Sequence, residues 1–261
     1  MKMDKIAVLI LVLHFHSYGQ QAATTRENVF PQGINIDYGL GRLSVKDDFF
    51  SREKYTGTLP YFRIGWSRFH DGEGIQLWLN YRSSSEIKNN HFSADVVQFS
   101  LELDHPYSVG AFALWSKNVY AYLGPSVEFF TYYNRLNFAS DGVFLDFSFA
   151  TLLSLGIHPL VVVPLRDRLQ LESSIQINAF SVVVRMPQII NVHNGSSNDS
   201  RLKLLTPFSS LNTQMNVGVR YCVFETLSLK LRYEFHVTRV TSWEFLLAAS
   251  DDAIVSVNYH L

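Results

Sequence analysis

The sequence contains almost no cysteine and few charged residues. Cys222 is the single cysteine among 261 residues, which excludes an internal disulfide framework and any zinc site built from several cysteines. Charged residues make up 17% of the chain and the formal net charge is −1, so the basic character that a nucleic-acid-binding surface needs is missing. The composition therefore indicates neither a disulfide-stabilised scaffold nor a nucleic-acid-binding protein.

Long apolar runs are also scarce. After residue 20 no uninterrupted apolar stretch reaches the roughly 20 residues that a membrane-spanning helix needs. The one compact run is "IAVLILVLHF" (6–15), which follows Lys2 and Lys5 and precedes the small residues of "SYG" (17–19). This order is typical of a secretory signal peptide. We predict a signal peptide over 1–19 and a short segment over 20–32 before the folded domain; the alternative is a buried N-terminal helix or strand.

The rest of the chain is dominated by alternation of apolar and polar residues. In "LSLKLRYEFHV" (227–237), one parity is wholly apolar, and the other holds Ser228, Lys230, Arg232, Glu234 and His236. This period of two is typical of β-strands. Ten segments follow it: 33–41, 61–69, 75–82, 96–103, 119–129, 145–157, 169–178, 215–223, 227–237 and 253–261.

Two architectures accept such strands. A soluble sheet buries its apolar face, whereas a transmembrane barrel turns that face toward lipid and encloses the polar one. The segments have about the length that a tilted strand needs to cross the hydrocarbon. Their polar parity is rich in Gly, Ser, Asn and Gln, unlike a solvated sheet face. We predict an all-β fold, a closed antiparallel up-and-down transmembrane barrel of about ten strands over 33–261, with eight or twelve strands as alternatives.

Aromatic residues and the breaks between strands agree with this interpretation. Tyrosine and tryptophan collect near segment ends, where a membrane–water boundary favours them: Tyr61, Trp66, Tyr81, Tyr132, Tyr133, Trp243 and Tyr259. Breaks at 70–74, 163–168 and 224–226 are short, and those at 45–58, 184–210 and 238–251 are long. Outer-membrane barrels have short turns at one end and long loops at the other. The break at 105–118 is longer than this scheme predicts and is a candidate for part of a longer hairpin.

In pattern and architecture nearly the whole mature chain resembles Gram-negative outer-membrane β-barrel proteins, and its two ends are similar to those of the Bacteroidetes type. The signal ends in "SYGQ", and "VSVNYHL" is similar to the terminal strand signal by which such barrels are recognised for assembly. Tyr259 and Leu261 hold its outward apolar positions, although the usual last residue is aromatic. The resemblance implies the outer membrane as location, with 20–32 and the short turns in the periplasm and the long loops outside. It also implies lipid or lipopolysaccharide, the barrel-assembly machinery and other outer-membrane or periplasmic proteins as partners.

The polar parity predicts a charged interior. The side chains expected to face the lumen are Asp37, Arg63, Arg82, Glu102, Glu128, Asp146, Glu172, Arg220, Lys230, Arg232, Glu234 and His236. Side chains fill a barrel of this size, and an unpaired buried ion costs several kcal/mol. Since the positive and negative charges nearly cancel, we expect a filled, salt-bridged interior. A narrow polar conduit is the alternative.

Three functions are compatible with this pattern. We expect a non-enzymatic structural or accessory subunit of an outer-membrane assembly; the alternatives are a narrow channel or transporter for small solutes and a barrel hydrolase acting on lipid A. Lipid A deacylases use a histidine in a His-x-Ser-Asn setting, whereas Thr238 and Arg239 follow His236 here. The sequence has no metal-ligand spacing, Gly-rich phosphate loop or hydrolase motif, so we expect no cofactor, metal or catalytic residue.

Overall fold

The computed structural model describes residues 32–48, 51–89, 93–114, 117–137, 147–188, 201–206, 209–241 and 245–261. Strands account for nearly all of them, and the described residues contain no helix long and apolar enough to cross a membrane. The predicted signal peptide (1–19) lies outside the described residues, as does the predicted segment 20–32 apart from Gln32.

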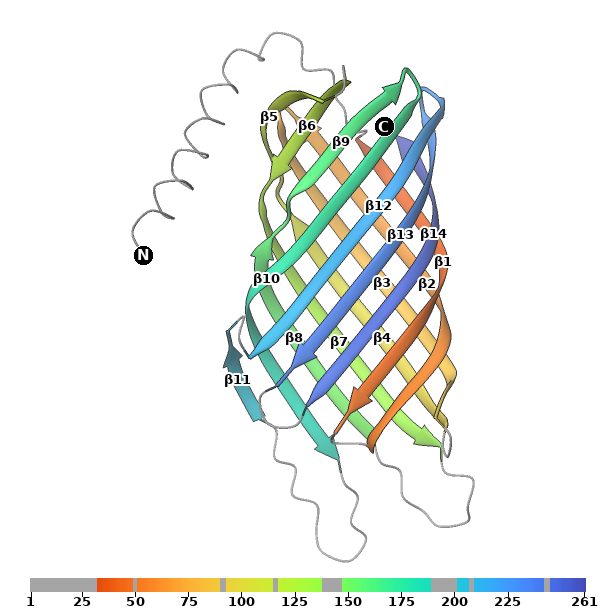
Figure 1. Cartoon of the computed structure of the whole chain (residues 1–261), viewed down its shortest axis with the longest axis vertical. Helices are drawn as coiled ribbons and strands as arrows, with labels where there is room; N and C mark the ends of the chain where they lie inside the picture. Colours follow the sequence, from red (N-terminus) through yellow and green to blue (C-terminus); the bar gives the residue numbers. More distant parts are fainter. Residues whose placement is uncertain are drawn as a thin grey trace, which may run out of the picture.

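Fourteen β-strands follow one another along the chain, and they wrap into a tall barrel-like wall whose strands are inclined to its long axis (Figure 1). They are β1 (Gly33–Asp47), β2 (Ser51–His70), β3 (Glu73–Lys88), β4 (Ser93–Asp104), β5 (Tyr107–Leu114), β6 (Lys117–Leu123), β7 (Pro125–Asn137), β8 (Phe147–Ile157), β9 (Leu160–Arg166), β10 (Leu169–Gln188), β11 (Arg201–Leu205), β12 (Ser210–Phe224), β13 (Leu227–Val240) and β14 (Leu246–His260).

Hydrogen bonding between the strands runs in a ring. The order is β12-β13-β14-β1-β2-β3-β4-β7-β8-β10, and β10 in turn pairs with β12 over residues 169–177. Each neighbouring pair in this order is antiparallel. The prediction of an all-β antiparallel fold is therefore confirmed.

The expected count of about ten strands differs from the fourteen that the structure contains. Breaks at His105–Pro106, at Gly124, which precedes Pro125, and at His158–Pro159 divide the chain between β4 and β5, between β6 and β7, and between β8 and β9. Proline has no N–H to donate to a ladder, so it favours such interruptions. β11 is a further short strand, which pairs with β10. The predicted segment 119–129 runs across the division between β6 and β7, whereas β5 lies in the predicted break at 105–118 and β9 lies outside the ten segments.

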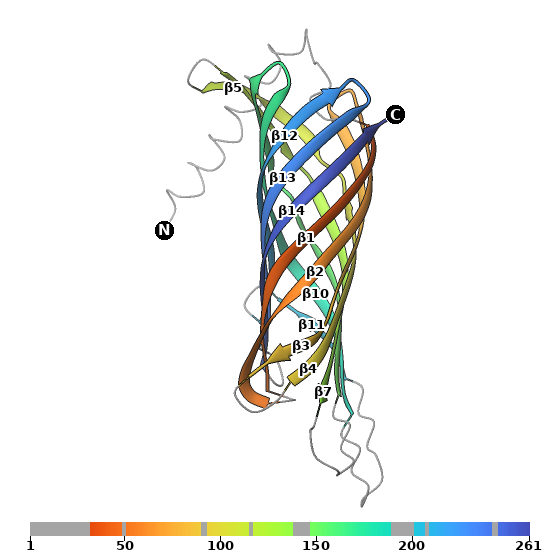
Figure 2. The same cartoon turned by 90° about the vertical axis from the view of Figure 1, so that its right-hand side faces the viewer.

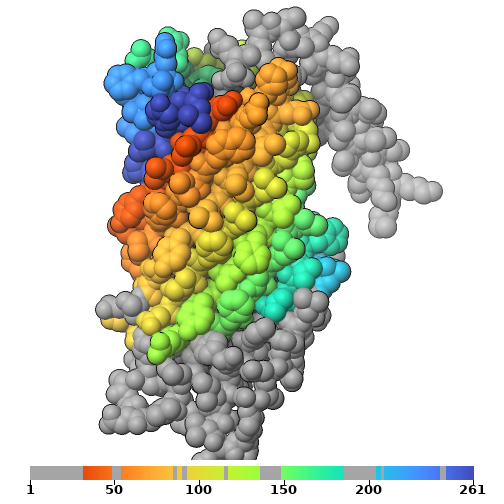
Figure 3. Space-filling view, turned by 180° about the vertical axis from the view of Figure 1, so that it is seen from behind, coloured from red at the N-terminus to blue at the C-terminus, as the bar shows by residue number. Residues whose placement is uncertain are grey.

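Over most of each strand, apolar side chains point outward and polar side chains point into the barrel. On β13, Leu229 and Leu231 are 42% and 64% exposed, whereas Arg232 and Glu234 are 5% and 1% exposed. A soluble sheet would show the opposite order. From behind, the outer side chains of neighbouring strands form continuous diagonal bands (Figure 3). The outer surface is thus largely apolar, as is typical of a barrel that meets lipid.

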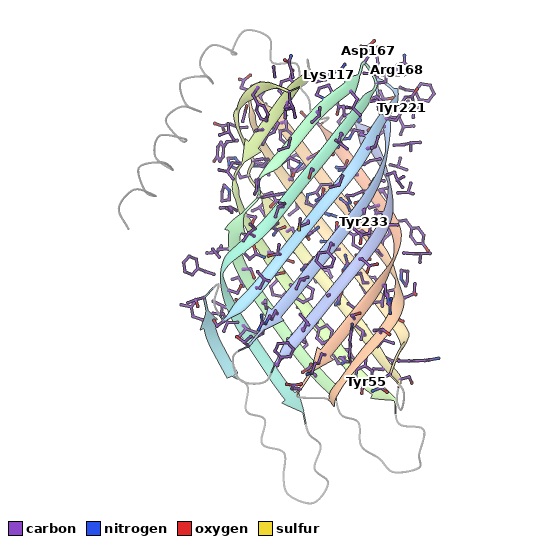
Figure 4. The ribbon with its side chains drawn as sticks, in the orientation of Figure 1. Tyr55, Lys117, Asp167, Arg168, Tyr221 and Tyr233 are labelled. Atoms are coloured by element: carbon purple, nitrogen blue, oxygen red, sulfur yellow. The ribbon has the colours of Figure 1, made fainter. Side chains whose placement is uncertain are left out.

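The two ends of the barrel differ. We call the end with the two-residue turns at 71–72, 167–168 and 225–226 the turn end; the C terminus lies there (Figures 1 and 2). Asp71 and Gly72 have φ angles of 50° and 84°, as the tightest hairpin turns require. The opposite end is the loop end. Figure 4 labels Asp167 and Arg168 at the turn end and Tyr55 at the loop end.

At the loop end the side chains still alternate between inward and outward positions, but the inward ones are now apolar and many outward ones are polar. Apolar side chains there are buried in a cluster, which we call the loop-end cluster: Leu43, Val45, Tyr55, Leu59, Ile87, Ala94, Val96, Phe130, Tyr132, Ala150, Leu152, Val183, Leu205, Val240, Leu246 and Ala248. Outward positions next to several of them are polar and exposed, such as Arg42, Thr58 and Arg239, whereas Leu153, next to Leu152, is apolar and exposed. This is the order of a soluble sheet, so the loop end has an exterior suited to water.

The regions expected to form long loops are largely strand, because the predicted segments stopped where the inward and outward chemistry reverses. Residues 45–58 and 238–251 are mostly strand, because β1 reaches Asp47, β2 begins at Ser51, β13 reaches Val240 and β14 begins at Leu246. In the expected loop 184–210, β10 extends to Gln188 and β11 forms, while 189–200 lies outside the described residues. The break at 105–118 contains β5 and the start of β6. Polar residues on the outward parity, such as Lys46 and Arg239, make the strand ends at 45–58 and 238–251 look like loops.

Candidate functional site

The middle of the interior holds one carboxylate that is shared by three guanidinium groups. Glu234 on β13 lies 3.6 Å from Arg63 Nη1, 3.1 Å from Arg82 Nη2 and 3.3 Å from Arg232 Nη2. The three arginines come from β2, β3 and β13. Each of these side chains is less than one-tenth exposed. Glu234 therefore joins three strands through charge inside the barrel.

Three more carboxylates balance the arginines. Arg63 Nη2 lies 3.0 Å from Glu102 Oε2, Arg82 Nη2 lies 2.8 Å from Asp252 Oδ2, and Arg232 Nη2 lies 2.8 Å from Asp37 Oδ2. We call the seven residues Asp37, Arg63, Arg82, Glu102, Arg232, Glu234 and Asp252 the central network. Removing one partner of a buried pair leaves a charge uncompensated and costs about 3–5 kcal/mol. The network thus strongly favours the one register that brings its partners together.

Neutral polar groups complete the central network. The Tyr61 hydroxyl donates to Asn80 Oδ1 at 3.1 Å, and Asn80 Nδ2 donates to Glu102. The Arg82 guanidinium lies 4.7 Å from the centre of the Tyr61 ring. Tyr61 and Tyr132 are 1% and 0% exposed, so the expectation that they lie at a membrane boundary is wrong. Both occupy the inward parity, which proximity to a segment end does not reveal.

A second ion cluster lies nearer the turn end. Glu172 Oε1 on β10 lies 2.9 Å from Arg220 Nη2 on β12, and Glu172 Oε2 accepts from Lys230 Nζ on β13. Arg220 and Lys230 are directly opposite each other in the β12–β13 register. Gly218 makes room for this arrangement, because a Cβ there would lie 2.8 Å from Lys230 Cε. One carboxylate thus bridges two cations that would otherwise repel each other.

His236 and Glu128 belong to a hydrogen-bond chain toward the loop end. Asn178 Nδ2 and Asn212 Nδ2 donate to Glu128 Oε2 at 2.8 and 2.6 Å. His236 Nε2 lies 2.8 Å from Asn212 Oδ1, and Phe130 packs against the imidazole edge-to-face. Since Asn212 donates through its amide nitrogen, its oxygen accepts from Nε2–H. That nitrogen is therefore engaged as a donor and is not available as a base toward Thr238, 3.3 Å away.

The residues predicted for the interior are placed as follows. Arg63, Arg82, Glu102, Glu128, Glu172, Arg220, Lys230, Arg232, Glu234 and His236 all lie inside the barrel, and Asp146 lies outside the described residues. Tyr259 and Leu261 are 53% and 68% exposed on the outer side at the turn end. The role of these two in assembly stays a prediction.

Sequence reasoning missed two acidic partners. Asp252 was absent from the predicted interior because the segment 253–261 begins one residue later, although Ser250 and Asp252 share the parity of Ser256 and Asn258. Asp104 lies 3.1 Å from His158 Nδ1, and both residues sit at the interrupted strands. Continuing each alternating segment to its last polar residue would have found both aspartates.

Two cavities adjoin the central network. The larger lies toward the turn end, where Asn35, Ser67, Gln76 and Asn258 line it. The smaller lies toward the loop end, where Gln98, Phe130, Gln214 and His236 line it. Arg63 and Arg232 border the first, and Arg82 and Glu234 border the second. The described residues contain no group of three or more side chains arranged to hold a metal ion.

Comparison with known proteins bears on the fold. No protein-family model matches the sequence, and no curated protein matches it. Among solved structures, the outer-membrane protease OmpT from Escherichia coli is similar, with a TM-score of 0.57 and 8% identity over 92% of this chain and 100% of that chain. The translocator domain of the autotransporter NalP from Neisseria meningitidis has a TM-score of 0.49 and 11% identity, over 99% of this chain and 98% of that chain. Neisserial surface protein A has a TM-score of 0.38 and 11% identity, over 89% of this chain and 99% of that chain. The likeness to OmpT shows that this chain has the fold of an outer-membrane β-barrel.

Proposed function

We propose that this chain is a non-enzymatic integral outer-membrane β-barrel that acts as a structural or accessory subunit of an outer-membrane protein assembly. The observation that carries the proposal is an apolar outer surface combined with an interior occupied by ion pairs and by the loop-end cluster. The exterior favours lipid over water. The packed interior leaves no wide aqueous path, which favours a structural role over transport.

The height of the apolar surface supports a membrane location. On β13 outward apolar side chains run from Leu227 to Val237, and Arg239 follows on the same face. At roughly 3.3 Å per residue and a tilt of about 40°, the ten steps from Leu227 to Val237 rise about 25 Å, which matches the band of about 25 Å in outer-membrane barrels. The polar exterior of the loop end begins where this band ends.

A membrane location also requires a closed sheet. Lipid offers no partner for backbone N–H and C=O groups, so a membrane barrel has no open edge at that depth. The pairing of β10 with β12 supplies the junction that a closed ten-strand circuit needs. By analogy with barrels that have short periplasmic turns, the turn end faces the periplasm and the loop end faces outside.

The β5–β6 hairpin is the surface that we assign to a partner. β5 leans away from the barrel wall at the turn end (Figure 2), and its pairing with β3 is limited to Tyr107 opposite Glu73. β6 pairs with β9 only over Tyr120–Tyr122 among the described residues. Val109, Phe112 and Leu114 on the hairpin are 40%, 43% and 43% exposed.

A two-stranded hairpin with exposed apolar side chains is marginal in water, and an unpaired strand edge is a template for another strand. We infer that an extended, apolar segment of a periplasmic protein pairs with the free edge of β5. Main-chain hydrogen bonds would supply affinity in such a complex, and the apolar side chains would supply specificity.

The proposal is tested by expressing the full chain in its native envelope, extracting it in mild detergent and identifying co-purifying proteins by mass spectrometry. A Val109→Lys/Phe112→Lys variant should insert and fold but lose a partner that the wild type retains. Glu225→Lys, an exposed change at the same end, is the matched control and should keep it. The accessory role is refuted if the wild type purifies alone, or if both variants keep the same partners. A chain that is monodisperse without detergent refutes the membrane location.

A further inference from the structure

The cavity toward the turn end, which we call the turn-end cavity, has an excess of positive charge. Its charged lining consists of Arg63, Arg220, Lys230 and Arg232 against Asp37 and Glu172. The smaller cavity has the opposite balance, with Arg82 against Glu102 and Glu234. The interior charges nearly cancel in total but are distributed unequally along the barrel.

Several donors that line the turn-end cavity lack a protein acceptor. Arg220 is 7% exposed; its Nη2 contacts Glu172, while Nε and Nη1 have no hydrogen-bond partner among the described residues. The same is true of Arg232 Nε and Ser256 Oγ, whose residues are 5% and 1% exposed. A buried donor without an acceptor costs about 1–3 kcal/mol, and more when it is charged. These groups come from β12, β13 and β14, three consecutive strands of the ring.

The two carboxylates that line the turn-end cavity, Asp37 and Glu172, are already engaged by cations. Glu172 is shared between Arg220 and Lys230, so that cluster keeps one positive charge in excess. Asp37 pairs with Arg232, and Arg232 also contacts Glu234 on the far side of the central network. The remaining donors therefore need an acceptor from outside the chain.

The turn-end cavity lies close to the turn end of the barrel. The loop-end cluster and the central network fill the interior on one side. Asn35 and Asn258 lie two residues from the turn-end limits of β1 and β14, and both line the cavity. A ligand would therefore enter from the turn end, past the polar side chains of Asn35 and Asn258.

We propose that the turn-end cavity binds a small oxyanion, such as inorganic phosphate or a free carboxylate, between Arg220, Arg232 and Ser256. Guanidinium groups suit this ligand because they present several N–H donors in a plane to its oxygens. The inference is independent of the docking role of β5–β6, because the two sites share no residue.

The test uses the full folded chain in detergent micelles, titrated with inorganic phosphate at constant ionic strength in chloride and followed by calorimetry. Acetate replaces phosphate in a second series to represent carboxylates. We expect saturable binding of one phosphate or one acetate per barrel. Arg220→Gln should weaken it about tenfold or more, since one charge-assisted hydrogen bond contributes about 1.5–3 kcal/mol. Folding of each variant is checked by its heat-dependent shift in gel mobility.

Ser256→Ala and Ser250→Ala form a matched pair for the case in which Arg220→Gln does not fold. Both serines are buried on β14 and share a parity, but Ser250 does not line the turn-end cavity and binds Arg82 and Asp252. Ser256→Ala should weaken binding several-fold and Ser250→Ala should not. The proposal is overturned if the folded wild type binds neither anion saturably, or if Ser256→Ala and Ser250→Ala bind equally.

Discussion

Arg82 on β3 and Asp252 on β14 meet inside the barrel, with 2.8 Å between Arg82 Nη2 and Asp252 Oδ2. Two strands, β1 and β2, separate β3 from β14 in the ring. The pair therefore crosses the interior instead of linking neighbours along the wall. Ser250 adds a hydrogen bond to each partner, at 2.6 Å to Arg82 and 3.2 Å to Asp252. This relationship makes Asp252 a sensitive probe of the central network.

Asp252→Ala should destabilise the barrel by about 3 kcal/mol, because Arg82 would lose one of its two buried carboxylates. Asp251→Ala is the matched control, since Asp251 is exposed on the outer face and Asp252 is 1% exposed. Urea unfolding in lipid vesicles, followed by tryptophan fluorescence, measures both. Equal losses in the two variants would contradict a structural role for the network.

Leu231→Arg should cost about 2–4 kcal/mol of unfolding free energy if Leu231 lies near the middle of the bilayer. Leu204→Arg serves as its control. The two leucines are 64% and 66% exposed, but Leu204 lies on β11 at the loop end, outside the ring. Exposure alone predicts the same small effect for both. A large effect confined to Leu231, measured by unfolding in vesicles, is expected only for a barrel surrounded by lipid.

Leu152→Ala should cost about 2–5 kcal/mol, the usual range when a large side chain is removed from a packed core. Leu153→Ala should cost clearly less, because Leu153 is 47% exposed and Leu152 is 0% exposed. Chemical denaturation of the two variants provides the comparison. The loop-end cluster would not be a packed core if the order of the two losses were reversed.

Planar bilayers containing the purified wild type should show no discrete conductance steps, because the loop-end cluster blocks the interior with apolar side chains. An unrelated porin prepared in the same detergent is the positive control. Steps that scale with protein concentration and show ion selectivity would support the narrow-channel alternative and refute the filled interior.

Which side chains of each strand face outward was predictable because the alternation of apolar and polar residues, with a period of two, determines it. A parity that combines Leu, Tyr, Phe and Val with another that combines Arg, Glu, Gly and Ser leaves few architectures available. Which charges pair was not predictable, since Arg82 and Asp252 come together only through ring order and register. Asp252 was further hidden because its neighbour Asp251 is also acidic and Ile254 interrupts the polar parity.

The loop end was not predictable under the assumption that inward residues stay polar throughout. Leu43 and Val45 are inward, yet the same chemistry nine residues earlier, at Ile34 and Ile36, is outward. Arg42 and Lys46 on the outer face then resemble the start of a loop. Following parity alone, without regard to polarity, would have extended β1 to its observed end at Asp47.

The change from an apolar to a polar exterior along a single strand marks in the sequence where the membrane–water boundary would lie. On β2 this change falls between Thr58 and Phe62, so the outward residues of the strand itself mark the margin of the apolar band. In the proposed orientation, an amine reagent that cannot penetrate cells should modify Lys54 on intact bacteria, whereas a guanidinium reagent should modify Arg68, at the turn end, only after the outer membrane is permeabilised.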